Sequence, residues 1–322
     1  MQFNWMMDVQ KRQIRFFAKR GVGPKVLFVN ILHKLFRASS ERFNLLATYD
    51  IFDFSHKAGE IKLIKDNVKI GIVIQGPIIA RTTLEICKYY KRIYPQVQVV
   101  ISTWEKENTD SFMALVDDRF SVIKTVKSDS PGPSNINLQI TSTINGIKLL
   151  VDQGCTHILK TRTDILLGNF SFLNYLLWMH SKGKKRAIVF SSFNSFLFRL
   201  FSPSDQVMFG EATDIARYWS TNLVPDDHKI DFPEKYLFEN YLKSCGYKTC
   251  DDFSNYLTAL RDYTVIADHE QLGQIWNKGA FTALNYRWRG EVFPNPMSQL
   301  TSWHWEMLQN EFSFFEKLHK SL

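Results

Sequence analysis

Cysteine is scarce in this sequence. Only four of the 322 residues are cysteines, at positions 87, 155, 245 and 250. Cys245 and Cys250 are spaced as C-x4-C, but no histidine stands beside them at zinc-binding spacing, so we expect no structural zinc site. So few cysteines in a chain of this length indicate a reducing compartment.

Long apolar runs are also missing. No stretch approaches the roughly 18 apolar residues that a membrane-spanning helix requires. The first residues, MQFNWMMDVQKRQ, lack the apolar core of a secretory signal. Both absences lead us to expect a cytoplasmic protein.

The common signatures of nucleotide and hydrolytic enzymes are absent. The sequence contains neither a G-x4-G-K-[ST] phosphate-binding loop nor a G-x-G-x-x-G dinucleotide fingerprint. G-x-S-x-G and H-E-x-x-H, the signatures of serine hydrolases and zinc peptidases, do not occur either. With 45% hydrophobic and 22% charged residues, the composition is that of an ordinary globular protein.

Positive charge is concentrated at one end of the chain. The formal net charge is +8, but residues 1–42 hold nine Lys or Arg against Asp8 and Glu41, which leaves +1 for the other 280 residues. A nucleic-acid-binding domain needs basic residues on its own binding face, so we expect no nucleic acid partner. We assign residues 1–65 to a basic helical segment. It is either a helix packed on the core or an amphipathic element on an anionic membrane face.

The order of apolar runs predicts an α/β fold. Strands are expected at residues 69–75, 96–103, 120–126, 156–159 and 185–193. Helices are expected at about residues 80–92, 138–153, 170–180 and 232–246, and residues 202–219 read as a short strand entering a helix. This order is typical of an open, Rossmann-like mixed sheet flanked by helices, in which ligands lie beyond the carboxyl ends of the strands. We assign residues 66–322 to this domain.

A polar run interrupts the apolar stretch THILKTRTDILL. It consists of Lys160, Thr161, Arg162, Thr163 and Asp164. Because the preceding helix ends near Gly154, the run is expected at the carboxyl end of a strand, on the ligand-binding rim. There Asp164 is suited to hold a divalent cation that neutralises a diphosphate. Alternatively, Lys160 or Arg162 neutralises the phosphates directly, or Asp164 caps the next element and pairs with Arg162.

Two further stretches supply candidate nucleotide contacts. Gln75-Gly76-Pro77 follows the first strand, where glycine permits close backbone approach and proline stiffens the turn. Arg81 comes at the expected start of the next helix, a position suited to meet a phosphate. Amide side chains suited to a base or to sugar hydroxyls, or alternatively to turn and capping roles, precede the 138–153 helix or begin it: Asn135, Asn137 and Gln139.

The second half of the chain contains candidate sugar-binding and acid–base groups. Polar residues stand together at the mouth of a strand, where they bind sugar hydroxyls or cap the next element: Ser202, Ser204, Asp205 and Gln206. Glu234 lies in the first turn of the 232–246 helix, where the helix dipole alone also favours an acid. His269 and His304 are late histidines, suited to complete a metal site or to serve a structural role.

Five blocks carry a family resemblance. In this order and spacing, GIVIQGPI, VVISTW, NINLQITSTINGI, ILKTRTD and FSPSDQVMFGEATDIARYW resemble the WavE family of lipopolysaccharide-synthesis proteins over roughly residues 69–245. That family is regarded as glycosyltransferases of bacterial surface polysaccharide assembly, and this chain looks like a member of the GT-A type. The resemblance implies a nucleotide-sugar-binding half at residues 66–168 and an acceptor-side half at residues 169–322.

The resemblance also implies roles for matched positions. Thr161–Asp164 stands where many GT-A enzymes carry Asp-x-Asp, Gln75–Pro77 would face the nucleotide, and Ser202–Gln206 would border the acceptor. Glu234 lies roughly where inverting enzymes place a catalytic base, and Asp205 is the other candidate base. Because Arg162 replaces the first acid of Asp-x-Asp, Mn²⁺ or Mg²⁺ would be held by Asp164 with a late histidine such as His304, or cationic neighbours would replace the metal.

The function implied is transfer of a sugar from a nucleotide-sugar to a lipopolysaccharide, lipooligosaccharide or capsule glycan. The acceptor would be lipid-linked or part of a lipopolysaccharide core, at the cytoplasmic face of the inner membrane. The basic N-terminal segment would hold the protein there as a peripheral protein. Two alternatives remain: a sugar nucleotidyltransferase, and a non-catalytic glycan-binding or scaffold component of polysaccharide assembly.

Overall fold

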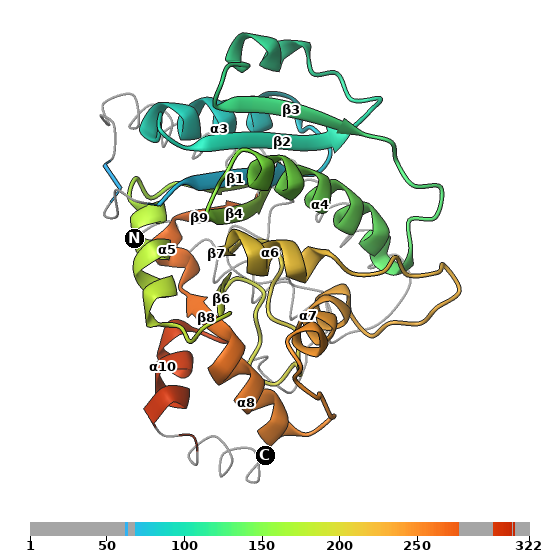
Figure 1. Cartoon of the computed structure of the whole chain (residues 1–322), viewed down its shortest axis with the longest axis vertical. Helices are drawn as coiled ribbons and strands as arrows, with labels where there is room; N and C mark the ends of the chain where they lie inside the picture. Colours follow the sequence, from blue (N-terminus) through green and yellow to red (C-terminus); the bar gives the residue numbers. More distant parts are fainter. Residues whose placement is uncertain (1–61, 64–67, 277–298, 311, 313–322) are drawn as a thin grey trace, which may run out of the picture.

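A computed structural model describes residues 62–63, 68–276, 299–310 and 312 of the chain (Figure 1). The basic segment expected at residues 1–65 lies outside the described residues except for Lys62 and Leu63. None of the described helices combines the length and the apolar character that crossing a membrane requires.

The centre of the fold is a seven-stranded sheet in the order β3-β2-β1-β4-β7-β6-β8. Its strands are β1 (Ile70–Gln75), β2 (Gln98–Trp104), β3 (Phe120–Thr125), β4 (His157–Arg162), β6 (Ile188–Ser191), β7 (Met208–Glu211) and β8 (Thr264–Ala267). β7 runs antiparallel to both its neighbours, whereas the other neighbouring pairs are parallel. The predicted α/β class, an open mixed sheet flanked by helices, is confirmed.

Helices cover both faces of this sheet. They are α3 (Ala80–Ile93), α4 (Ile136–Asp152), α5 (Phe172–Lys182), α6 (Ala212–Trp219), α7 (Pro233–Ser244), α8 (Phe253–Tyr263), α9 (His269–Leu272) and α10 (Ser302–Asn310). α4 packs on β1 and β2, and α6 lies against both α4 and α7, so these three helices form one layer (Figure 1). α3 packs against α5 through rings such as Tyr94 and Phe172, whose centroids are 5.2 Å apart.

The strands of the parallel part are apolar because they are buried on both faces. All six residues of β1 and all seven of β2 are buried. α4 approaches β1 most closely at Gly146, where a Cβ atom would lie 2.4 Å from a methyl group of Val73. Glycine at this position allows the helix to seat directly on the sheet.

Three tyrosines of α3 fix the chain that follows β4. Tyr90 accepts a hydrogen bond from the Leu167 amide at 2.9 Å. Tyr89 and Tyr94 donate to the carbonyls of Gly168 and Phe170 at 3.0 and 2.5 Å. The segment on the far side of the Asp164 turn is therefore tied to a rigid helix.

β4 is longer than the sequence predicts. The strand was expected to end at Leu159, yet Lys160, Thr161 and Arg162 continue its pairing with β1. Lys160 is completely buried although it carries an ammonium group. The polar run is thus partly inside the sheet, where Lys160 donates to the Asp205 backbone carbonyl and Arg162 pairs with Asp164.

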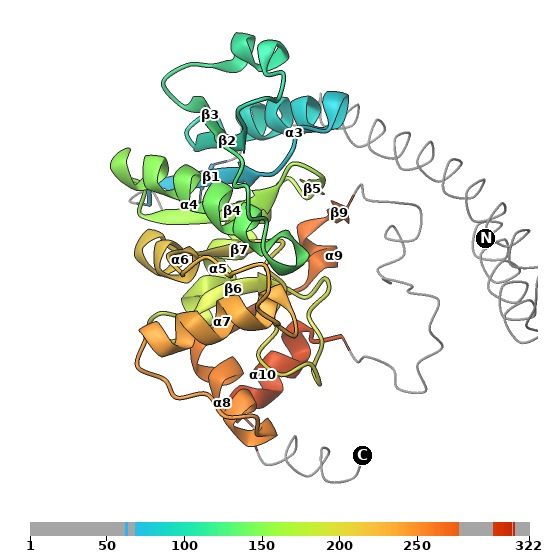
Figure 2. The same ribbon diagram turned by 90° about the vertical axis from the view of Figure 1, so that its right-hand side faces the viewer.

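A second, two-stranded sheet lies beside the first. β5 (Ile165–Leu167) pairs antiparallel with β9 (Gln274–Trp276), with Ile165 opposite Trp276. Figure 2 shows β9 next to α9. This pairing brings Trp276 to the turn that carries Asp164.

Candidate active site

A cavity of about 690 Å³ opens where β1 and β4 end. The carboxyl ends of parallel strands are the edge at which such sheets present loops to ligands. Further wall residues come from the start of α4, the segment before β7 and the start of α7, and from the end of β2, the segment after β3 and β9. Eleven residues proposed from the sequence contribute to it: Gln75, Gly76, Pro77, Asn135, Gln139, Arg162, Thr163, Asp164, Asp205, Gln206 and Glu234.

The loop after β1 is held from two sides. The Gly76 amide donates to the Ser102 carbonyl at 3.1 Å, and the Thr163 hydroxyl donates to the Pro77 carbonyl at 2.7 Å. Gly76 has a φ of +129°, which residues with side chains rarely adopt. A Cβ atom there would lie 3.0 Å from the Thr163 hydroxyl oxygen. Glycine is therefore what allows the β1 and β4 loops to meet.

Gly76→Ala is expected to lower the free energy of unfolding by about 2–3 kcal/mol, since it adds a close contact to an unfavourable φ. Gly154→Ala is the matched control, because Gly154 also has a positive φ, +78°, but no atom lies within 4 Å of the place that a Cβ atom would take. The control is expected to lose only about 1 kcal/mol. Denaturant unfolding measures both, and equal losses would contradict the contact with Thr163.

Arg162 and Asp164 form a two-pronged ion pair at the centre of the wall. Arg162 donates from Nε to Asp164 Oδ1 and from Nη2 to Oδ2, each at 2.8 Å. Trp276 also donates its indole N–H to Asp164 Oδ2 at 2.9 Å. Burial by itself would lower the pKa of Arg162, but its bonds to Asp164 and the charges of Asp205 and Glu234 outweigh this effect and raise the pKa. Arg162 therefore stays charged.

These residues do not fit a divalent metal ion. Both oxygens of Asp164 already accept charge-assisted or indole hydrogen bonds, and the Arg162 guanidinium repels a cation at the same carboxylate. His304 does not line the cavity: it lies on α10, where its ring bonds the Thr301 hydroxyl at 2.8 Å. Within the described residues no group of three or more His, Cys, Asp or Glu side chains is placed to bind a metal. His304 therefore does not share the cavity wall with Asp164.

Asp205 and Gln206 line the cavity, and each has a buried acceptor atom without a hydrogen-bond partner among the described residues. Asp205 is 4% exposed and Gln206 is 7% exposed. Asp205 Oδ2 and Gln206 Oε1 are buried and accept no hydrogen bond from any described residue. A buried acceptor without a donor is costly, so a ligand with hydroxyl donors would satisfy both atoms.

Lys160 is hydrogen-bonded to the backbone of Asp205. Its ammonium donates to the Asp205 backbone carbonyl at 2.6 Å and lies 4.8 Å from the centre of the Trp219 ring. Burial lowers the pKa of Lys160 to about 8, with Arg162 adding to the lowering while the charges of Asp205, Asp164 and Glu234 oppose it. Lys160 therefore contacts the main chain of the site and is not part of the cavity wall.

The short turn just before α4 presents strained backbone to the cavity. Ser134 and Asn135 both line it, with φ of +54° and +61°. Non-glycine residues adopt such angles rarely, and they are found more often at functional sites. Asn137 does not reach the cavity. Its amide instead bonds the backbone of Val224 in both directions at 2.7 Å, which ties the segment before α7 to α4.

The remaining predicted residues lie elsewhere. Thr161, Ser202 and Ser204 are buried outside the cavity wall. The Ser202 hydroxyl donates to the Leu200 carbonyl at 3.1 Å, and the Ser204 amide donates to the Ser195 hydroxyl at 2.9 Å, so both shape the chain before Asp205. His269 bonds the Ser192 hydroxyl at 2.8 Å. The Arg81 side chain lies outside the described part of the chain.

Several wall residues were not anticipated: Trp104, Glu107, Lys127, Leu138, Arg199, Asp231, Phe232 and Trp276. Trp104 ends β2 and Lys127 follows β3. Ligands lie beyond the carboxyl ends of the strands in such sheets, so considering the end of every strand would have found both residues. Arg199 and Trp276 carried no such signal, because only the tertiary fold brings them to the wall.

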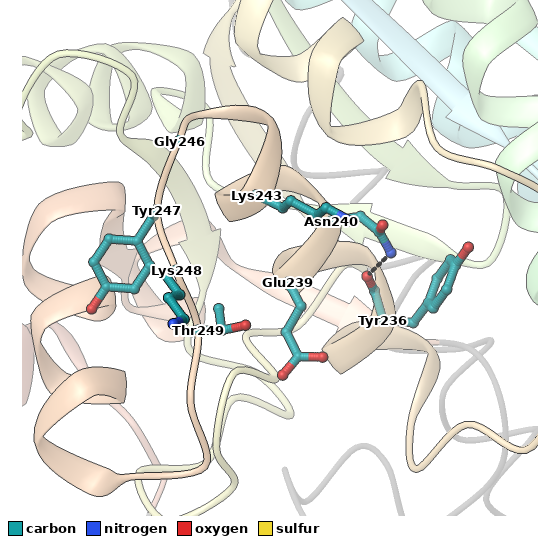
Figure 3. Close-up of a pocket in the computed structure, with 8 residues that line it drawn as sticks. All are labelled: Tyr236, Glu239, Asn240, Lys243, Gly246, Tyr247, Lys248 and Thr249. Atoms are coloured by element: carbon teal, nitrogen blue, oxygen red, sulfur yellow. Dashed lines mark hydrogen bonds between the residues drawn. The ribbon is translucent and has the colours of Figure 1, made fainter.

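A second hollow, of about 570 Å³, lies along α7 and the loop after it. In Figure 3 Tyr236 and Tyr247 stand on opposite sides of it, with Glu239 between them. None of the residues proposed from the sequence lines this groove. The candidate site is therefore the cavity at the sheet edge.

Comparison with known proteins adds a family. A family model described as WavE lipopolysaccharide synthesis matches residues 70–278, a span that holds every strand and the whole described cavity wall. No curated protein matches the sequence significantly.

Solved structures match at low identity. Mannose-1-phosphate geranyltransferase from Thermus thermophilus has 12% identity and a TM-score of 0.28, over 38% of this chain and 41% of that one. A cytidylyltransferase from Leptospira borgpetersenii serovar Hardjo-bovis has 14% identity and a TM-score of 0.31, over 60% of this chain and 94% of that one. A 4-diphosphocytidyl-2C-methyl-D-erythritol synthase has 12% identity and a TM-score of 0.35, over 56% of this chain and 87% of that one. Identities this low do not bear on activity.

Proposed function

Because the chain belongs to the WavE lipopolysaccharide synthesis family, we propose that it is a glycosyltransferase. It moves a sugar from a nucleotide-sugar to a growing lipopolysaccharide, lipooligosaccharide or capsule glycan. The family match supports the pathway, and the cavity supports the reaction.

The observation that carries this proposal is a pair of buried acceptors that have no partner among the described residues, Asp205 Oδ2 and Gln206 Oε1. They belong to the same cavity as the Gln75–Pro77 loop and the Arg162 guanidinium. One part of the wall thus offers acceptors for sugar hydroxyls, while another offers cationic and backbone groups for a nucleotide. A transferase needs both kinds of group within reach of each other.

The reaction we derive is displacement at the anomeric carbon. The acceptor hydroxyl forms the new C–O bond, the bond from the sugar to the diphosphate breaks, and the nucleoside diphosphate leaves. We propose that the hydroxyl proton passes to Asp205, and the burial of this carboxylate at the cavity wall supports a role as general base. Glu234, on the first turn of α7, is the second candidate for this role.

The partners follow from the same proposal. The acceptor is a lipid-linked or core glycan at the cytoplasmic face of the inner membrane. The nine basic residues of segment 1–42 would bring the protein to the anionic surface of that membrane as a peripheral protein.

A thermal-shift panel tests the class of reaction. Nucleotide-sugars and their nucleoside diphosphates are expected to raise Tm, because a ligand that binds the folded state stabilises it by mass action. Incubation with the stabilising nucleotide-sugar and a glycan acceptor should then release nucleoside diphosphate. Release of pyrophosphate from a nucleoside triphosphate and a sugar phosphate would indicate a nucleotidyltransferase instead. No shift with any nucleotide would favour a glycan-binding or scaffold role.

A further inference from the structure

The cavity contains two arginines whose guanidinium planes are fixed by neighbouring side chains. We propose that Arg162 and Arg199 form a site that binds the diphosphate of the donor without a divalent cation. This inference rests on the glycosyltransferase function proposed above. It goes further by naming the groups that neutralise the leaving diphosphate.

Arg162 is oriented by Asp164. The fork between them uses two of the five N–H groups of a guanidinium, Nε and one on Nη2. The rest of the group borders the cavity, and the Trp276 ring, 5.9 Å from the guanidinium carbon, supports it. Asp164 is thus a positioning residue, which holds the plane of Arg162 instead of ligating a metal.

Arg199 is oriented by two aromatic rings. Its guanidinium carbon lies 4.8 Å from the centre of the Phe196 ring and 4.4 Å from that of Phe232. Contacts with the faces of both rings restrict the guanidinium plane, and hydrogen bonds form at its edges. Phe232 also lines the cavity and directly precedes α7, so Arg199 belongs to the same wall as Glu234.

Two oriented guanidinium groups suit a diphosphate. Arginine matches phosphate oxygens through parallel N–H bonds, and it is always charged. Asp164 balances the charge of Arg162, and Arg199 and Lys127 add two further cations to the wall. The same wall carries four other carboxylates, of Glu107, Asp205, Asp231 and Glu234. Negative charge that grows on the diphosphate as the sugar bond breaks would meet groups already in place, so no metal ion is required for that task.

Isothermal titration calorimetry tests the site on the full chain. UDP, GDP, CDP, ADP and dTDP are titrated in EDTA and again in Mn²⁺. At least one is expected to bind in EDTA, with a Kd within about threefold of that in Mn²⁺. Arg199→Ala should weaken this binding by roughly tenfold or more, since a charged hydrogen-bond donor is lost. Arg199→Lys should recover little, because an ammonium lacks the planar fork.

The controls separate this site from a merely structural effect. Arg119→Ala, just before β3 and so at the opposite edge of the sheet, should leave the affinity unchanged. The matching nucleoside, which lacks phosphate, should bind the Arg199 variants as it binds the wild type. Asp164→Asn should weaken diphosphate binding equally in EDTA and in Mn²⁺. If Asp164 instead ligated a metal ion, Asp164→Asn would weaken diphosphate binding only in Mn²⁺.

Three outcomes overturn the inference. Nucleoside diphosphate binding that occurs only in Mn²⁺ would remove the cation-independent site but leave the donor site and the proposed function standing. Unchanged affinity in Arg199→Ala would remove Arg199 from it. Absence of binding by every nucleotide under both conditions would remove the inference and the proposed function together.

Discussion

Asp205→Asn is expected to lower kcat by about 10²–10⁴-fold while the fold and donor affinity are retained. The carboxylate is almost completely buried at the cavity wall, and its Oδ2 atom has no hydrogen-bond partner among the described residues, which supports the base role proposed for it. Asparagine preserves the shape but does not accept a proton. The measurement is nucleoside diphosphate release, using the donor identified by thermal shift.

Two variants serve as controls for Asp205. Asp118→Asn removes an exposed carboxylate near β3 and should leave kcat unchanged. Glu234→Gln should lower kcat by a smaller factor than Asp205→Asn does. A wild-type kcat in Asp205→Asn, together with a large loss in Glu234→Gln, would assign the base to Glu234 instead.

Lys160→Met is expected to lower kcat by roughly 10–100-fold with little change in donor affinity. The lysine ammonium holds the backbone carbonyl of Asp205, and catalysis is sensitive to misplacement of about 1 Å. Stability at pH 7 should stay within about 2 kcal/mol of wild type, because the lost hydrogen bond is offset by removal of a buried charge. Lys184→Met, an exposed lysine paired with Asp262, is the matched control.

The pH dependence of stability identifies the buried ammonium directly. Lys160 has a pKa of about 8 in the folded protein, against 10.5 ordinarily. Below pH 8 Lys160 is charged in both the folded and the unfolded protein, so it does not make the free energy of unfolding depend on pH. Between pH 8 and 10.5 the unfolded chain retains a proton that the folded protein has lost, so the free energy of unfolding gains a term that rises with pH.

Subtracting the Lys160→Met curve from that of the wild type isolates this term, because other titrating groups are common to both proteins. The difference should grow by on the order of 3 kcal/mol across that window. Chemical unfolding at a series of pH values measures it. A flat difference would show that Lys160 has an ordinary pKa and is solvated.

The sequence by itself determined the fold class and one side of the site. Continuous apolar runs such as β1 and β2 identify strands buried on both faces, and the residues that follow a parallel strand must lie at its carboxyl edge. Gln75–Pro77 and Arg162–Asp164 were therefore predictable as neighbours. Asp205 and Glu234 were proposed as single residues, and the fold brings both to the same cavity.

Only the tertiary structure decided which groups those residues contact. A polar side chain looks the same in sequence whether it faces a cavity or bonds a neighbouring backbone, and this is why the sequence left both roles open for Asn137, Ser202 and Ser204. Arg199 and Trp276 reach the wall through long-range packing that leaves no local pattern. Asp164 reads as a metal ligand until Arg162 and Trp276 are seen to occupy its oxygens. Hydrogen-bond satisfaction depends on partners distant in the chain, and only the folded structure supplies them.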